Sequence, residues 1–443
     1  MFNTLINACL LISALIAGVW ITLSIWNKPV FVIHFQLIYC CFMRFLTQQL
    51  HIPEVIKYLS DYLTIILFIQ IVLHFNKTRN INIFKPLLFI FLYLATVLIS
   101  TFSNGSSFIF FIWGARVNIR FFVFFLACVI FLRKNNLDNL MKFLLFLLPL
   151  NTVLVLFQYF VMGNRDDYIG GFFGVWQGCN GELLLYLLVV TAISIFFYIS
   201  NKMNIFRLIV NIGLVSLIAA ISELKFIFII LVIMMFFAVI LTFPSVRALK
   251  MSFAGVAIVI SAFLLFLILY PDWRNEWGSL QSAIFASTEK NYAGSQSLSR
   301  FTAGSYILQN IILEPRQRLF GIGFGNADKF LSFTSSFYNR YEELGYGLFS
   351  YTLMFIEIGI LGLIIYCLFF ASISIDSLRV KYKSNPNMKF YLNISFIVSI
   401  TVFLLILYNQ SMYLDAAFII FFILSFPFII EKELFIGSSI VGE

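Results

Sequence analysis

The sequence predicts an all-α, polytopic integral membrane protein with about 12 or 13 transmembrane helices. Of its 443 residues, 61% are hydrophobic, only 11% are charged, and 56 are phenylalanine. A soluble domain carries about 25% charged residues. Because this chain has less than half of that share, lipid must form much of its surroundings. The net charge of +9 is better explained by orientation in a membrane than by nucleic acid, which we do not expect as a partner.

Apolar segments of the length that crosses a bilayer, about 20 residues, recur along the chain. We expect them near residues 4–26, 30–50, 58–75, 86–103, 108–132, 142–162, 181–200, 205–221, 225–243, 251–270, 346–371, 390–408 and 412–430. The second is the weakest, because Arg44 and two glutamines near its end are typical of an interfacial or re-entrant piece. Three parts follow: an N-terminal transmembrane bundle (1–270), a long loop (271–345) and C-terminal transmembrane helices (346–443).

Basic residues fall in alternate loops, as a consistent threading through a membrane requires. These loops contain Lys77, Arg79 and Lys85; Arg133, Lys134 and Lys142; Lys202 and Arg207; Arg247 and Lys250; and Arg379, Lys381, Lys383 and Lys389. By the positive-inside rule they are cytoplasmic, and so is the C-terminus. The long loop 271–345 and the short loops 103–107, 163–180, 222–225 and 409–411 then face the other side. A loop of that length is usually functional.

Two arginines interrupt the apolar segment 108–132. Arg116 and Arg120 are one helical turn apart and therefore share a face. If the helix begins near Phe108 on the outer side, they lie about 12 Å and about 18 Å from its end. A charge at the centre of a membrane helix costs about 2.5–3.5 kcal/mol on insertion scales, which favours a function. The alternative is that both arginines snorkel to the headgroups.

A second polar group, ISELKF (221–226), places Glu223 and Lys225 between two apolar segments with hardly any turn. One interpretation is a charged floor to an outward-facing cavity. The other is the polar tip of a short hairpin at the outer surface.

The outer loop NRDDYIGGFFGVWQGCNGEL (164–183) is rich in glycine and contains Asp167, Trp176 and Glu182. Glycine allows the backbone to approach a ligand closely, and Trp176 offers a flat face on which a sugar can stack. The alternative is an ordinary flexible turn with a carboxylate at the start of the next helix.

Within the long loop, residues 297–330 combine arginines with glycines. Arg300 leads an amphipathic run, and Arg316 and Arg318 precede the segment GIGFG (321–325). Guanidinium groups bind phosphate through two hydrogen bonds, and glycine amides can line an anion site. Solvated loop charges are the alternative. All four polar groups fall in the outer half of the protein or on its outer side, and this convergence argues for a site there.

Taken in order, these features resemble the bacterial O-antigen and exopolysaccharide polymerases, a family that also includes the O-antigen ligases. The resemblance covers most of the chain. It rests on the segments YLSDYLTIILF, WGARVNIRFF, DYIGGFFGVWQGCNG and SELKF, on Arg300 followed by EPRQRLFGIGFGNA, and on FIEIGILGLIIY. Their order and spacing, together with the long outer loop, carry the resemblance.

The resemblance implies a GT-C-like glycosyltransferase of the bacterial inner membrane that joins undecaprenyl-diphosphate-linked repeat units on the extracytoplasmic face, using neither metal nor nucleotide. Its expected partners are the lipid-linked glycans, membrane lipid, and the flippase and chain-length regulator of the same pathway. The donor diphosphate is assigned to Arg116, Arg120 and Arg300, with Lys225, Arg316 and Arg318 as further candidates. Of the first two, Arg120 is the preferred ligand. The base that accepts the acceptor proton is assigned, in falling order, to Glu223, Glu182 and Asp167.

One departure from the family pattern separates two interpretations. The ligases have a histidine near the end of the long loop, whereas this chain reads RYEELGYGLFSYTLM there and has no histidine in 271–345. This absence favours the polymerase interpretation over the ligase interpretation. Glu342, Glu343 and Tyr346 are weak substitutes for the missing base. A ligase of the same fold and a flippase of the lipid-linked oligosaccharide are the rival functions. A flippase is disfavoured because no internal repeat is found and the charges cluster toward the outer half.

Overall fold

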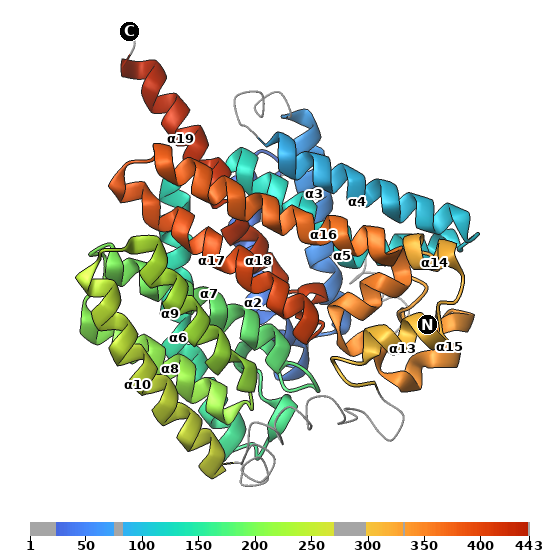
Figure 1. The fold of residues 1–443 in the computed structure, drawn as a ribbon, viewed down its shortest axis with the longest axis horizontal. Helices are drawn as coiled ribbons and strands as arrows, with labels where there is room; N and C mark the ends of the chain where they lie inside the picture. Colours follow the sequence, from blue (N-terminus) through green and yellow to red (C-terminus); the bar gives the residue numbers. More distant parts are fainter. Residues whose placement is uncertain (1–23, 75–82, 270–297, 331–332, 442–443) are drawn as a thin grey trace, which may run out of the picture.

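The computed structural model describes residues 24–74, 83–269, 298–330 and 333–441, and in that part of the chain it is a bundle of long helices (Figure 1). Ten helical segments there are long and apolar enough to cross a membrane. They are α2 (Pro29–Gln48), the segment Glu54–Leu73 (η1, Glu54–Tyr58, followed by α3, Leu59–Leu73), α4 (Phe84–Ser103), α5 (Phe108–Phe131), α6 (Lys134–Phe160), α7 (Asn180–Ile199), α9 (Lys225–Thr242), α10 (Val246–Leu269), α16 (Ser350–Lys383) and α17 (Pro386–Tyr408). The protein is therefore a multi-pass membrane protein of the all-α class, as the sequence predicts.

Two of the expected spans differ in detail, and a third, 4–26, lies almost wholly outside the described residues. The segment 205–221 forms a helix of only 17 residues, α8 (Ile205–Ile221). The segment 412–430 is divided between α18 (Ala417–Leu424) and α19 (Phe426–Val441), because Pro427 has no N–H for a continuous helix but is tolerated in the first turn of a new one.

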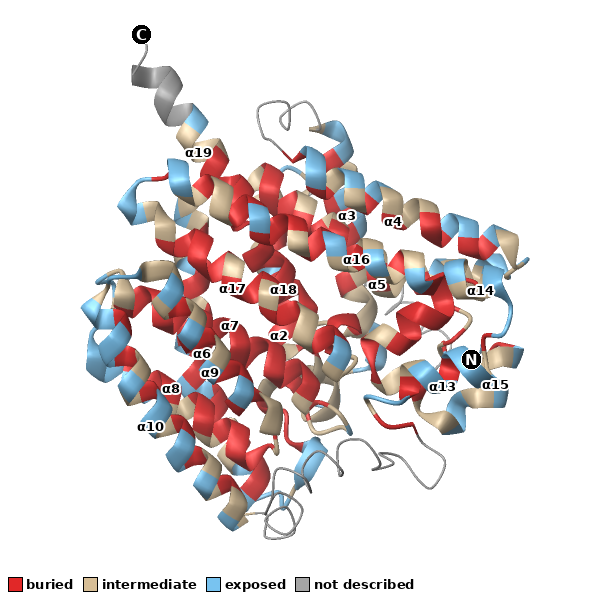
Figure 2. Ribbon diagram, in the orientation of Figure 1, coloured by how far each residue is buried: buried red, intermediate tan, exposed pale blue. Residues whose placement is uncertain are grey.

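The centre of the bundle is α7, in whose most apolar 18-residue stretch 94% of the residues are buried, whereas the figure for the corresponding stretch of α10 at the periphery is only 17%. Figure 2 shows the same contrast and adds α17 and α18 to the buried centre. A helix that is apolar on all sides can be enclosed by its neighbours because it has no polar face that needs water. The buried Glu182 in the first turn of α7 is therefore surrounded by protein and not by lipid.

The basic loops that lie within the described residues meet at one end of the bundle. Lys202 Nζ lies 3.2 Å from Asp138 Oδ1, and Lys381 Nζ donates to the carbonyl of Leu241 at 2.7 Å. At the other end, the loop 163–180 contacts the end of α2, where Val175 N donates to Gln48 Oε1 at 2.8 Å. The grouping of loops by charge thus corresponds to two opposite ends of the molecule.

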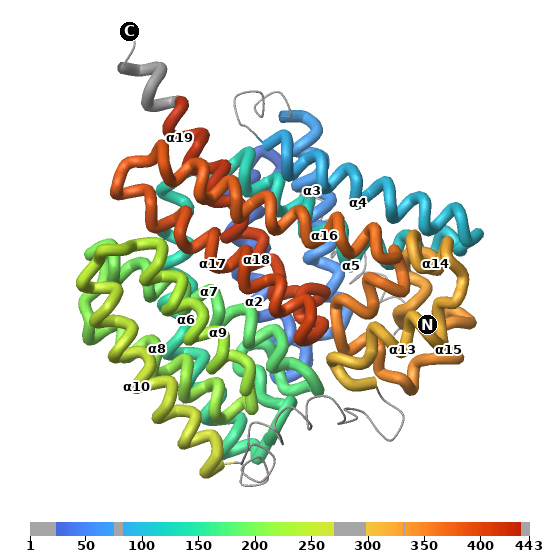
Figure 3. Tube along the Cα trace, viewed as in Figure 1, coloured from blue at the N-terminus to red at the C-terminus, as the bar shows by residue number. Residues whose placement is uncertain are grey.

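The described part of the long loop forms three short helices beside the first turns of α16 (Figure 3). They are α13 (Ala303–Asn310), α14 (Pro315–Phe320) and α15 (Ser336–Tyr341). The glycines that follow α14 fit closely against the bundle: a Cβ on Gly321 would lie 2.3 Å from the carbonyl of Glu357, and one on Gly325 would lie 2.1 Å from that of Phe110. Gly359, with φ of 69°, kinks α16 next to Leu319. This packing fixes the segment that follows, 326–330.

Candidate functional site

A cavity of about 280 Å³ lies at the end of the bundle opposite the basic loops. Its walls come from the end of α2, the end of η1, the N-terminal part of α5, the segment 328–330, the start of α16 and the connection 410–415. The lining residues are Met43, Arg44, Lys57, Tyr58, Trp113, Arg116, Val117, Arg120, Asp328, Lys329, Phe330, Leu353, Gln410, Tyr413, Leu414 and Asp415. Segments far apart in the sequence therefore converge on one space.

The cavity wall carries more positive than negative charge. Five lining side chains are cationic (Arg44, Lys57, Arg116, Arg120 and Lys329) and two are carboxylates (Asp328 and Asp415). A cleft lined by one sign of charge concentrates ligands of the opposite sign. Arginine is also suited to the planar, bidentate recognition of phosphate or carboxylate. The wall is consequently suited to an anion.

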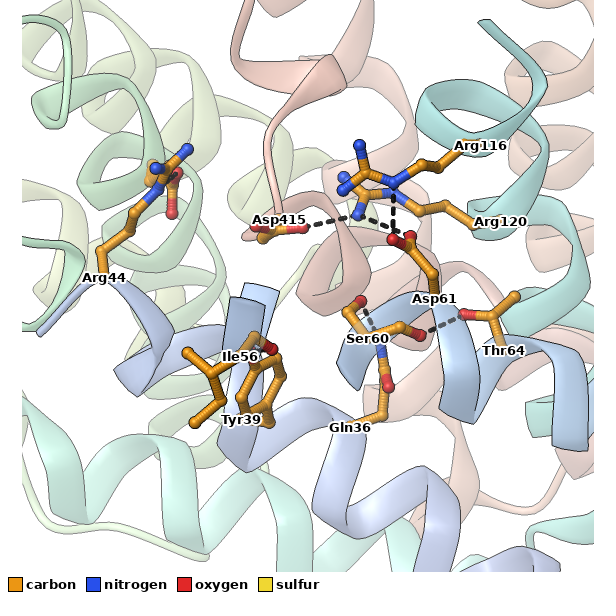
Figure 4. A network of polar contacts seen from close by, with 11 residues as sticks. Gln36, Tyr39, Arg44, Ile56, Ser60, Asp61, Thr64, Arg116, Arg120 and Asp415 are labelled. Atoms are coloured by element: carbon orange, nitrogen blue, oxygen red, sulfur yellow. Dashed lines mark hydrogen bonds and ion pairs between the residues drawn. The ribbon is translucent and has the colours of Figure 1, made fainter. Parts of the chain in front are cut away.

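Arg116 and Arg120 are held in this wall by two aspartates, Asp61 of α3 and Asp415 of the connection before α18 (Figure 4). Arg116 Nε lies 2.5 Å from Asp61 Oδ2. Arg120 Nη1 lies 2.7 Å from Asp415 Oδ1 and 3.7 Å from Asp61 Oδ1. The helix begins at Phe108, as expected, and both guanidinium groups point into the bundle. Snorkelling does not account for Arg120, whose side chain is only 9% exposed.

Aromatic rings further restrict Arg116. Its guanidinium carbon lies 4.9 Å from the ring centre of Tyr58 and 5.0 Å from that of Trp113. Trp113 in turn stacks on Phe330, with ring centres 5.9 Å apart. Cation–π contacts of this kind stabilise a cation by about 0.5–2 kcal/mol each. Arg116 therefore has a fixed position before any ligand arrives.

A third arginine, Arg44, extends the charges along the same wall. Its Nε atom lies 3.8 Å from Oε1 of Glu182, a side chain with no exposed surface, and its guanidinium carbon lies 4.8 Å from the ring centre of Trp176. Within the described residues neither carboxylate oxygen of Glu182 has a hydrogen-bond partner. Such a buried, unsatisfied pair points to water or a ligand group between the two side chains.

The glycine-rich loop 164–183 is folded into the protein and is not a flexible turn. Gln158 binds Gly171 through both its amide oxygen and its amide nitrogen, at 2.8 and 2.9 Å. Asn151 Oδ1 accepts from the amide of Phe172 at 2.8 Å. The loop packs beside Arg44 and Glu182, of which Glu182 has no exposed surface whereas Arg44 keeps 31% of its side chain exposed.

A second polar cluster lies at the same end but outside the cavity lining. It contains the ion pair of Glu223 with Lys225, at 2.8 Å, and Asp167, whose Oδ1 accepts from Asn180 Nδ2 at 2.6 Å. Burial raises the pKa of Glu223, an effect that the neighbouring Lys225 opposes. The same Asn180 amide donates to the carbonyl of Ser222 at 3.3 Å and so joins the two loops.

Arg300 lies next to this second cluster. Its guanidinium carbon lies 3.9 Å from the ring centre of Tyr408, and Tyr408 stacks on Phe226 at 4.0 Å. The Tyr351 hydroxyl donates to the Arg300 carbonyl at 2.6 Å. Arg300 is thus ordered near the end of α17, although it is not part of the cavity lining with Arg116 and Arg120.

The other two predicted arginines lie farther from the cavity. Arg318 donates from Nε to the carbonyl of Ile312 and from Nη2 to that of Leu308, both at 3.0 Å, and so ties α14 to α13. Arg316 is exposed. The chain between these arginines and the cavity makes contacts within the protein: just after the glycine segment, the amide of Ala327 donates to Glu357 Oε1 at 3.3 Å. It contributes to the site by placing Asp328, Lys329 and Phe330 in the wall.

Of the ten predicted site residues, only Arg116 and Arg120 line the cavity, and Glu182 and Trp176 contact it through Arg44. Residue-by-residue reading of the sequence missed Asp415, Lys57 and Lys329 and used Arg44 only as a sign of a weak span. Asp61 entered the sequence prediction only as part of the segment YLSDYLTIILF, without a role of its own. The signal that could have found Asp61 is a carboxylate in an apolar segment, which, like an arginine there, requires a partner of opposite charge.

Among the described residues, no group of three or more His, Cys, Asp or Glu side chains is placed to hold a metal ion. No protein-family model matches the chain, and no curated protein or solved structure matches it either. The cavity and its charges are therefore the observations on which a function must rest.

Proposed function

We propose that this protein is a polysaccharide polymerase of the bacterial inner membrane, with a GT-C-like architecture and a cytoplasmic C-terminus. It joins oligosaccharide repeat units that are carried on undecaprenyl diphosphate, at the outer face of the membrane. The observation that carries this proposal is the cavity in which Arg44, Arg116 and Arg120 converge at the end of a membrane bundle.

The position of the cavity suits a lipid-borne anion. Arg120 lies about 18 Å along α5 from its first residue by helical rise, so a ligand that reaches it must enter the membrane-spanning part of the protein, as the headgroup of a lipid-linked donor can. Burying several cations in a membrane protein costs free energy, so residues of this kind usually mark a functional site. An excess of cations over carboxylates in the lining matches a ligand with two or more negative charges.

The chemistry follows from the same residues. When the bond between the donor sugar and its diphosphate breaks, negative charge develops on the diphosphate, and cations held in advance stabilise that charge without reorganising. The rings of Trp113, Phe330 and Trp176 supply flat apolar faces for sugars close to the charges. The second cluster, with Glu223, Lys225 and Arg300, is assigned to the approach of the acceptor glycan.

The test uses the purified full-length protein in lipid nanodiscs with a synthetic undecaprenyl-diphosphate-linked repeat unit. A ladder of products that differ by one repeat unit is the expected result. A single transfer to a lipid A core acceptor without a ladder would indicate a ligase. Movement of the lipid-linked unit across vesicles without any new glycosidic bond would indicate a flippase.

A further inference from the structure

Asp415 is mounted on a rigid connection between α17 and α18. Ser350 donates to the carbonyl of Asn409 from both its amide, at 3.1 Å, and its hydroxyl, at 2.8 Å. The side chain of Asn409 accepts from the amide of Ser411 at 3.0 Å, and Phe418 N donates to the carbonyl of Asp415 at 3.2 Å. A carboxylate on such a support keeps its direction when a ligand binds.

The three carboxylates that lie nearest the cavity arginines have different surroundings. Asp61 has one oxygen directed to each of two arginines, and although its side chain is 18% exposed it is not part of the lining. Glu182 has no exposed surface. Asp415 lines the cavity, its side chain is 13% exposed, and its Oδ1 atom has no well-aligned hydrogen bond within the described residues although Arg120 Nη1 is only 2.7 Å away. Of the two carboxylates that line the cavity, Asp328 and Asp415, only Asp415 lies within ion-pair distance of one of its arginines in the described part of the chain.

From this arrangement we infer that Asp415 is the catalytic base that accepts the proton of the acceptor hydroxyl. This inference rests on the proposed function. It replaces Glu223, Glu182 and Asp167 in that role, because those side chains do not line the cavity that holds the paired arginines.

In the step, the oxygen of the acceptor hydroxyl forms a bond to the anomeric carbon of the donor sugar. The bond from that carbon to the diphosphate oxygen breaks, and its electron pair leaves with the diphosphate, which Arg116 and Arg120 stabilise. The hydroxyl proton passes to Asp415, and Asp415 later releases it to water. No oxidant, reductant or further reactant is needed.

The ion pair between Asp415 and Arg120 sets the order of events. The donor diphosphate and the Asp415 carboxylate compete for the same guanidinium group, whereas Asp61 keeps its hold on Arg116. Once phosphate oxygens occupy Arg120, the carboxylate of Asp415 is released to accept a hydrogen bond from the acceptor. The base therefore becomes available only after the donor has bound.

The test compares donor binding with transfer in the full-length protein in nanodiscs, using the synthetic lipid-linked repeat unit. Asp415→Asn is expected to lower the transfer rate by about 100-fold or more, the usual contribution of a positioned base. Donor affinity is expected to stay equal or to rise, because a competing negative charge has been removed. Asp138→Asn, at the opposite end of the bundle, is the control and is expected to polymerise as the wild type does.

Two outcomes overturn the inference while leaving the proposed function intact: polymerisation by Asp415→Asn at the wild-type rate, or loss of donor binding in parallel with transfer. If Asp415→Asn does not fold, Asp415→Ala with added formate replaces it. Restored transfer supports a missing base, and no response from a variant that binds donor normally contradicts it. A wild-type protein that neither binds donor nor makes a ladder overturns the proposed function first.

Discussion

Arg120 and Asp415 form an ion pair in the cavity wall, with Nη1 of the arginine 2.7 Å from Oδ1 of the aspartate. They come from α5 and from the connection before α18, so the pair joins two distant parts of the chain. Arg120 also lies 3.7 Å from Asp61, so its planar group lies between two carboxylates. A guanidinium in this position is held ready for an anion that can take the place of Asp415.

Replacement of Arg120 tests this arrangement. Arg120→Ala is expected to lower polymerisation by about 100-fold or more, the usual loss when one preorganised donor to a developing negative charge is removed. Arg120→Lys is also expected to lose most activity, since a point charge does not reproduce a planar fork. The measurement is the rate of ladder formation in nanodiscs, with Arg379→Lys at the other end of the bundle as control. Equal activity in all three variants would contradict the assignment.

Gly325 tests the role of the glycine segment. Its φ is +78°, and an added Cβ would lie 2.1 Å from the carbonyl of Phe110. Gly325→Ala is therefore expected to lower the free energy of unfolding by about 2–5 kcal/mol, from backbone strain and overpacking together. Gly347→Ala is the matched control, because nothing lies within 4 Å of its added Cβ. Thermal unfolding in detergent measures both, and equal stability of the two variants would be inconsistent with this packing.

Replacement of Lys432 tests how the C-terminal end of α5 is stabilised. Its Nζ atom donates to the carbonyls of Val129, Ile130 and Leu132, at 3.0, 3.1 and 2.7 Å. Val129 and Ile130 belong to the last turn of the helix and Leu132 is its C-cap residue, so these carbonyls have no partner within the helix. Lys432→Met is expected to cost about 1.5–3 kcal/mol of stability, the range for hydrogen bonds to a charged group.

The control for Lys432 is Lys383→Met. Lys383 is exposed in the last turn of α16, and its replacement is expected to change the unfolding midpoint only slightly. If both variants unfold at the same temperature, Lys432 does not cap α5.

The carboxyl of Asp328 is expected to make the stability of the protein depend on pH. Burial raises its pKa, and the hydrogen bond from the amide of Lys329 opposes that rise in part. The folded protein therefore favours the protonated carboxyl, and ionisation destabilises it. Asp328→Asn is expected to raise the unfolding midpoint at pH 7. The gain should shrink as the pH falls through the raised pKa and should vanish below the ordinary pKa of aspartate.

Unfolding in detergent between pH 4 and pH 7 checks this prediction. Comparison of the variant with the wild type isolates Asp328, because every other titrating group is common to both. Asp166→Asn, an exposed side chain in the loop 164–183, is the control. A pH-independent difference between Asp328→Asn and the wild type would show that ionisation of this carboxyl is not the cause.

The membrane class and the positions of most helices could be predicted from the sequence, because hydropathy and loop charge are local properties. The start of α5 at Phe108 and the grouping of loops at two ends followed from those signals. The division between α18 and α19 was not predicted, although Pro427 was its local signal. The unusual depth of Arg116 and Arg120 was also visible, since charge inside an apolar segment is conspicuous wherever it occurs.

The partners of those arginines were decided only by the tertiary structure. Asp61 and Asp415 contact these arginines, and Arg44 reaches the same cavity, because packing sets the rotation and register of each helix. No local sequence pattern records either property. The same packing uses the glycines of GIGFG to bring the chain against α5 and α16 and places Arg318 against the carbonyls of α13. A charge in a membrane segment shows that a partner must exist, but which residue supplies it depends on the three-dimensional arrangement of the helices.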